Sequence, residues 1–128
     1  MREWDADTLL LFNQQPSALL LLAALEDAIC ARFPETKRRV QKTQISYYQR
    51  FVFACVSLAR VKRKAELPRT WITLTLGLNY PLESPRVAAK TEVYPGRWTT
   101  HIVLGAPEDL DEELLSWLEE AYVFSERK

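Results

Sequence analysis

The sequence predicts an α+β domain: a helix, then an antiparallel sheet of about five strands, then an amphipathic helix packed on that sheet. Three observations lead to this prediction. A run of helix formers between two prolines comes first, short segments rich in β-branched and aromatic residues fill the middle, and apolar residues recur at helical spacing near the end. A chain of 128 residues can bury one such core but not two, so we expect a single domain.

The first main helix is expected over Ser17–Arg32. Pro16 suits the first helical position, because its fixed backbone angle matches the helix and the missing N–H would be unpaired there anyway. Pro34 ends the run. The following segment, Glu35–Thr43, is polar and basic without a period, and it indicates a crossover from the helix to the sheet.

Five segments have the composition of strands. They are Gln44–Gln49, Phe51–Ala59, Trp71–Tyr80, Val87–Val93 and Trp98–Leu104. The first two are almost contiguous, which predicts a tight hairpin near Gln49 and Arg50. The third alternates, with Thr73 and Thr75 on the face opposite four apolar residues, as a half-buried central strand does.

Two further helical segments are expected at the ends of the chain. Thr8–Asn13 predicts one short helical turn, with Asp7 or Thr8 as its cap. Near the C-terminus, Asp109 and Glu112 have the spacing of a capping box. Apolar residues then follow at helical intervals, at Leu110, Leu114, Trp117, Leu118, Ala121 and Tyr122. They predict a helix that covers the sheet.

Charge is balanced overall but unevenly distributed. The formal net charge is zero. Between Glu35 and Arg69 there are ten basic residues and two acidic ones, whereas Glu108–Lys128 contains eight acidic and two basic residues. We therefore expect a molecule with two electrostatically different sides.

The remaining composition narrows the class of protein. The first seven residues are acidic rather than a basic stretch leading into an apolar run, so we expect a cytoplasmic protein without a signal peptide. The longest apolar run, Ala18–Leu25, is too short to span a membrane. Cys30 and Cys55 lie in apolar patterns and are expected as buried, reduced thiols. With one histidine and no paired-cysteine motif, we expect no metal and no cofactor.

Five stretches of sequence carry a resemblance to a known family. They are Lys42-Thr-Gln44-Ile45-Ser-Tyr, Phe53-Ala54, Gly96-Arg97-Trp98-Thr-Thr-His101-Ile102, Asp109-Leu110-Asp111-Glu112-Glu113-Leu114 and Trp117-Leu118-Glu-Glu-Ala121-Tyr122. In this order and spacing the chain resembles the bacterial domain of unknown function family 5655, from about Leu11 to Tyr122. The resemblance implies a small α+β domain with no established activity. It also implies that Lys42, Gln44 and His101 occupy recurring polar positions.

Our leading hypothesis is a non-enzymatic binding domain. If the polar residues entering the first strand face those of the fifth, their ammonium, amide, guanidinium and imidazole groups converge on a small anionic ligand or on a side chain of a protein partner. The residues expected to form this site are Lys42, Gln44, Arg97 and His101. Whether the chain is a monomer or a homodimer stays open.

Two alternatives belong to other classes. An accessory nucleic-acid-binding domain would use the basic residues Lys37, Arg38, Arg39, Lys62, Arg63 and Lys64. Zero net charge and the absence of a nucleic-acid-binding motif disfavour it. An enzyme would use His101 as a general base, and would need a nucleophile within hydrogen-bond reach. No GxSxG or glycine-rich phosphate loop is present, so we expect a protein that is not an enzyme.

Overall fold

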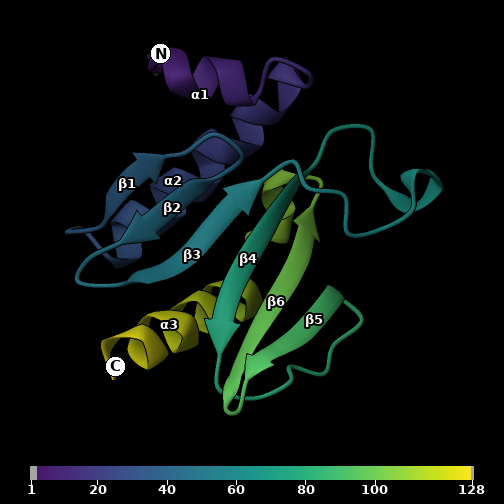
Figure 1. Cartoon of the computed structure of the whole chain (residues 1–128). Helices are drawn as coiled ribbons and strands as arrows, with labels where there is room; N and C mark the ends of the chain where they lie inside the picture. Colours follow the sequence, from purple (N-terminus) through teal and green to yellow (C-terminus); the bar gives the residue numbers. More distant parts are fainter. Residues whose placement is uncertain (1–2, 128) are drawn as a thin grey trace.

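The computed structural model describes residues 3–127, with Lys64 described by its backbone only. Within residues 3–127, three α-helices, six strands and three 3₁₀ turns follow one another (Figure 1). In order they are α1 (Ala6–Leu11), η1 (Pro16–Ala18), α2 (Leu19–Arg32), β1 (Lys37–Val40), β2 (Ile45–Tyr48), β3 (Val52–Ser57), η2 (Lys64–Glu66), β4 (Ile72–Leu78), β5 (Val87–Tyr94), β6 (Arg97–Leu104), η3 (Pro107–Asp109) and α3 (Glu112–Glu126). The predicted α+β class is confirmed.

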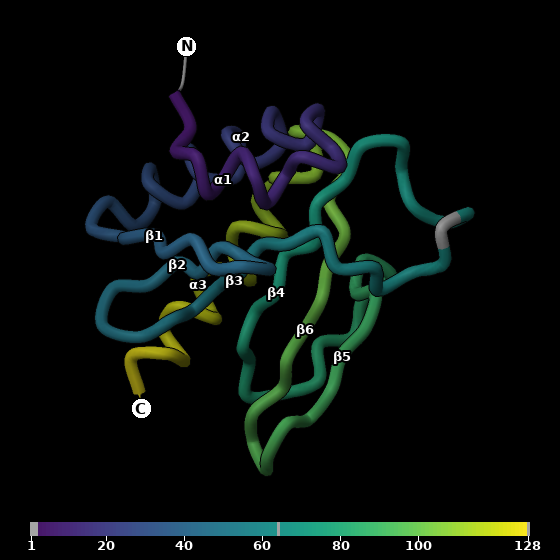
Figure 2. Tube along the Cα trace, turned by 45° about the horizontal axis from the view of Figure 1, so that its top comes forward, coloured from purple at the N-terminus to yellow at the C-terminus, as the bar shows by residue number. Residues whose placement is uncertain are grey.

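The strands form one antiparallel sheet in the order β1-β2-β3-β4-β6-β5. Figures 1 and 2 show α2 and α3 on the same face of this sheet, α2 behind β1 and β2 and α3 behind β3 and β4. The core lies between the two layers. Its fully buried side chains include Leu22, Leu25, Ile45, Leu74, Leu76, Ile102, Leu114 and Leu118.

The strand β1 was not predicted. It lies inside Glu35–Thr43, which the sequence indicated as a crossover from the helix to the sheet. Three of its four residues are basic, so it carries no apolar alternation. Edge strands commonly carry such charges, because they discourage pairing with other sheets. Within β1, Arg38 turns toward α2 and binds the buried carboxylate of Glu26, with Nε 2.9 Å from Oε2.

The helix caps also differ from prediction. Asp5, rather than Asp7 or Thr8, caps α1, because its side chain accepts the backbone N–H of Thr8. Asp111, rather than Asp109, caps α3 by accepting the N–H of Leu114. In each case the helix boundary is displaced by about two residues from the predicted one.

A bulge in the hairpin of β2 and β3 shapes the sheet. Tyr47 lies opposite Ala54 while Tyr48 lies opposite Val52, so Phe53 is the extra residue. Its ring packs edge-on against Phe33 and Tyr122, on the helix side. The ladder of β3 with β4 runs only from Ser57–Thr73 to Ala54–Leu76, and the two strands diverge beyond it (Figure 1). We call this divergence the β3–β4 fork.

Candidate functional site

The sheet face opposite the helices carries a polar row. Ser46, Cys55, Thr75 and His101 are successive cross-strand partners on β2, β3, β4 and β6. Since successive residues of a strand point to opposite faces, these four side chains lie on the face away from buried Leu74 and its neighbours. We call this surface the polar face.

Side chains at the β2 end of the polar face form a hydrogen-bonded group. Ser46 Oγ donates to Gln41 Oε1 at 2.7 Å, and Gln44 Nε2 donates to the same oxygen at 3.2 Å. Gln44 Nε2 also lies 3.5 Å from Cys55 Sγ. Burial raises the pKa of the Cys55 thiol, although the Ser46 hydrogen bond and the positive charge of Arg97 act in the opposite direction. Cys55 is therefore a protonated thiol at neutral pH.

Arg97 is the first residue of β6, and its side chain extends across β4 into the β3–β4 fork. Its guanidinium passes over Gly77 of β4, so closely that a Cβ added to this glycine would be 2.9 Å from Nη2. Beyond Gly77, Cζ lies 5.8 Å from the centre of the Phe124 ring on α3. A cleft of about 60 Å³ opens beside the guanidinium, and Cys55 and Thr99 are among its lining residues. That volume is about twice the share of one water molecule in the liquid, enough for one small anionic group.

Arg97 differs from other partly buried arginines in having no acidic partner. Arg38 and Arg86 each pair with two carboxylates. Among the side chains that the structure describes, no carboxylate or other hydrogen-bond acceptor pairs with Arg97. Its described neighbours are the ring of Phe124 and the backbone of Gly77, neither of which carries a negative charge, so the fork can accommodate an added one.

His101 lies next to Thr75 on the polar face. Its Nδ1 is 2.9 Å from Thr75 Oγ1, and burial lowers the pKa of the imidazole. The ring is therefore neutral at pH 7. A catalytic base also needs a group that orients its second nitrogen. Within residues 3–127 no such group is hydrogen-bonded to His101. The histidine thus has a neighbouring hydroxyl, from Thr75, but not the orienting third member of a catalytic triad.

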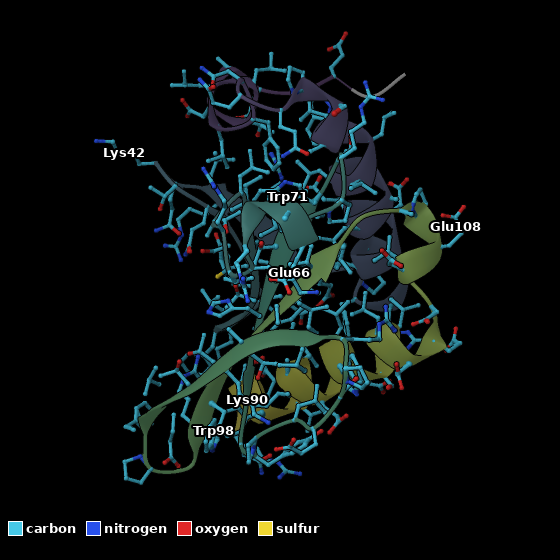
Figure 3. All side chains as sticks on the ribbon, turned by 90° about the vertical axis from the view of Figure 1, so that its right-hand side faces the viewer. Lys42, Glu66, Trp71, Lys90, Trp98 and Glu108 are labelled. Carbon is cyan, nitrogen blue, oxygen red and sulfur yellow. The ribbon has the colours of Figure 1, made fainter. Side chains whose placement is uncertain are left out.

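Lys42 lies apart from the other predicted site residues. Gln41 N donates to Gln44 O at 2.8 Å and closes a hairpin whose tip is Lys42 and Thr43. Figure 3 shows the Lys42 side chain extending away from the molecule. Because the strand begins at Ile45, the alternation that would align Lys42 with Gln44 does not extend to it. The structure thus gathers Gln44, Arg97 and His101 on the polar face, without Lys42.

Comparison with known proteins identifies the family. Residues 10–125 match the family model described as "Domain of unknown function (DUF5655)". The chain belongs to this family. Neither the curated proteins nor the solved structures contain a match. The matched region of the DUF5655 domain includes the whole sheet with α2 and most of α3, and therefore all of the polar face. In residues 3–127, no helix has the length and apolar character needed to cross a membrane.

The described basic residues that the nucleic-acid hypothesis invokes in this DUF5655 domain do not form one patch. Lys37, Arg38 and Arg39 belong to β1. Lys62 and Arg63 lie in the loop 58–71, which projects from the opposite side of the sheet in Figures 1 and 2. The Lys64 side chain lies outside the described residues. Arg38 is occupied by carboxylates, so the nucleic-acid hypothesis loses its central residue in β1.

The two cysteines have different surroundings. Both are free, but Cys30 is exposed, contrary to the prediction of a buried thiol. The buried face of α2 runs through Leu22, Glu26 and Ile29, and Cys30 lies one residue beyond it. Cys55 is partly buried, between the buried thiol that was predicted and an exposed one. No group of three potential metal ligands occurs within the described part of the chain.

Three residues of the site were not identified from the sequence. Cys55 and Thr75 lie on the polar face by the strand alternation that also buries Leu74. That alternation was available as a signal, but strand order was needed to place the two residues side by side. Gly77 has no sequence signal of its own. Its role depends on the path of the Arg97 side chain across β4.

Proposed function

We propose that this DUF5655 domain is a non-enzymatic binding domain that receives a small anionic group, a carboxylate or a phosphate, at Arg97. The observation that carries the proposal is the partly buried guanidinium, which has no carboxylate partner among the described residues. A guanidinium offers a planar fork of N–H donors that matches the two oxygens of such a group. An anion in the fork would supply the acceptors that Arg97 lacks.

The surroundings of Arg97 support a ligand that is only partly enclosed. The cleft of about 60 Å³ has room for one anionic group and not for a whole metabolite. The rest of the ligand, or of a protein partner that presents a carboxylate, would lie along the polar face. There the amide of Gln44 and the neutral imidazole of His101 offer further hydrogen bonds.

The proposal is tested by titrating ¹⁵N-labelled protein with sodium phosphate and with sodium acetate at constant ionic strength. We expect saturable shifts of the backbone amides of Gly77, Thr99 and Cys55. Arg97→Gln should abolish these shifts, because it removes the charge and the fork while keeping a polar side chain. Lys42→Gln is the matched control, since it removes one positive charge outside the fork and should leave the titration unchanged.

Two results would contradict the proposal. One is the absence of saturable shifts at the fork with either anion up to about 100 mM, which would mean that the dissociation constant exceeds that concentration. The other is an equal loss in the Arg97→Gln and Lys42→Gln variants, which would mean that the anions respond to overall charge and not to the fork.

A further inference from the structure

The sheet has two edge strands, β1 and β5, and they differ in charge. An edge strand exposes backbone N–H and C=O groups that can pair with another strand. In β1 the consecutive residues Lys37, Arg38 and Arg39 oppose the approach of a second copy of themselves. In β5 one lysine and one glutamate balance each other. Of the two edges, β5 is the one suited to self-association.

Strand β5 has a regular central part that faces outward. Its pairing with β6 is in register from Ala89 to Glu92, with register shifts on either side. Figure 1 shows β5 as the outermost strand, and in Figure 3, viewed from that side, Lys90 is labelled beside it. Val93 and Tyr94 at its end are 54% and 53% exposed. Large apolar side chains are thus available next to the open edge.

Symmetry restricts how two such strands can pair. A two-fold axis that relates adjacent antiparallel strands must be perpendicular to the sheet, and it then places one residue opposite its own copy. An axis at Lys90 would oppose two ammonium groups, and an axis at Glu92 would oppose two carboxylates. An axis at Thr91 places Lys90 opposite the partner's Glu92, and repeats that pair on the other side.

We propose that two copies of this chain associate through β5 in antiparallel pairing centred on Thr91, joining the two six-stranded sheets into one. The central pair is then threonine opposite threonine, which is a favourable cross-strand combination, and two opposite-charge pairs flank it. Lys90 Nζ lies 3.2 Å from the carbonyl oxygen of Leu82 and forms an ion pair with Glu83 of the same chain, so in the dimer the ammonium would be shared between Glu83 and the partner's Glu92. The interface is independent of anion binding at Arg97.

Sedimentation velocity at several concentrations tests this pairing. Wild-type protein should show a reversible monomer–dimer equilibrium. Lys90→Glu and Glu92→Lys should each weaken the dimer about tenfold or more, because each turns two attractive pairs into two repulsive ones. An equimolar mixture of the two variants should restore association, since every Glu then faces a Lys. The double variant Lys90→Glu/Glu92→Lys should dimerise like the wild type.

Three outcomes would overturn the proposal: a wild type that stays monomeric up to about 1 mM, single variants that associate as the wild type does, or a mixture no stronger than its components. Circular dichroism verifies that each variant is folded. If a single variant is unfolded, Thr91→Lys replaces it, because this change puts two ammonium groups at the axis and should likewise give monomer.

Discussion

Replacing Gly77 with alanine should separate anion binding from stability. Gly77 is in an extended strand and does not have a positive backbone φ angle, so alanine fits its backbone. The added Cβ would lie 2.9 Å from Arg97 Nη2, 3.1 Å from Cζ and 3.2 Å from Nη1. These atoms are the far end of a flexible side chain, so the guanidinium moves and the strand does not. The change therefore displaces Arg97 from the fork.

The two effects of Gly77→Ala on the free energy of unfolding nearly cancel. Alanine lowers the entropy of the unfolded chain relative to glycine, which stabilises a strand by roughly 0.5–1 kcal/mol. Moving Arg97 removes its contact with the Phe124 ring, which is worth about 0.5–1 kcal/mol at a partly exposed site. We expect the free energy of unfolding to change by less than about 1 kcal/mol, while the response of the fork to phosphate and acetate is lost.

Urea unfolding followed by tryptophan fluorescence measures the free energy of unfolding, and the NMR titration measures the response of the fork to phosphate and acetate. The reasoning is refuted if Gly77→Ala binds anions as the wild type does. It is also refuted if the variant is destabilised by more than about 2 kcal/mol, because overpacking of rigid atoms would then dominate.

Three further predictions concern the fold around the site. Gly105→Ala should destabilise by about 1–3 kcal/mol in urea unfolding, since its Cβ would lie 2.6 Å from Cγ of the rigid Pro68 ring; an unchanged midpoint would contradict this. Tyr47→Phe should cost about 1.5–3 kcal/mol, because the buried hydroxyl donates to the Glu26 carboxylate at 2.7 Å; a neutral effect would mean that water replaces the bond. Burial lowers the pKa of His101 below 6.5 in the folded state, so wild-type stability should fall as pH drops from 6.5 through that lower pKa. Thermal unfolding of His101→Gln should show a smaller fall between pH 7 and pH 5, and equal slopes would contradict the assignment.

Most of the fold was predictable because its strands carry apolar alternation. The strand β4 shows this best: Ile72, Leu74, Leu76 and Leu78 are all buried, as the period-two pattern predicts. The strand β1 has no such pattern, because only one of its two inward residues, Val40, is apolar and the other is Arg38. What stabilises Arg38 is Glu26, a buried acid on another element, and a single sequence does not reveal that pairing.

The candidate site was predictable in part for a similar reason. His101 lies on the polar face because strand alternation determines its direction, and Gln44, one residue before β2, contacts Ser46 on the same face. Lys42 was predicted to share this face, but it lies at the tip of a hairpin, before β2 begins at Ile45. The convergence of Arg97 with Cys55 depends on the end of the β3–β4 ladder at Ala54, and on a glycine that lets a side chain cross a strand. Neither feature has a local sequence signature strong enough to predict.

At the β3–β4 fork the two halves of the sheet are joined by a short ladder, while α3 packs on both β3 and β4. The β4–β6 ladder runs from Ile72 to Leu78, whereas β3 and β4 are joined only over the upper part of their length. An anion in the fork would contact both sides of this narrow junction, because Cys55 comes from one half of the sheet and Arg97 from the other. Binding would then resist opening of the junction, and hydrogen exchange of the β3 and β4 amides would slow as the anion concentration rises above its dissociation constant.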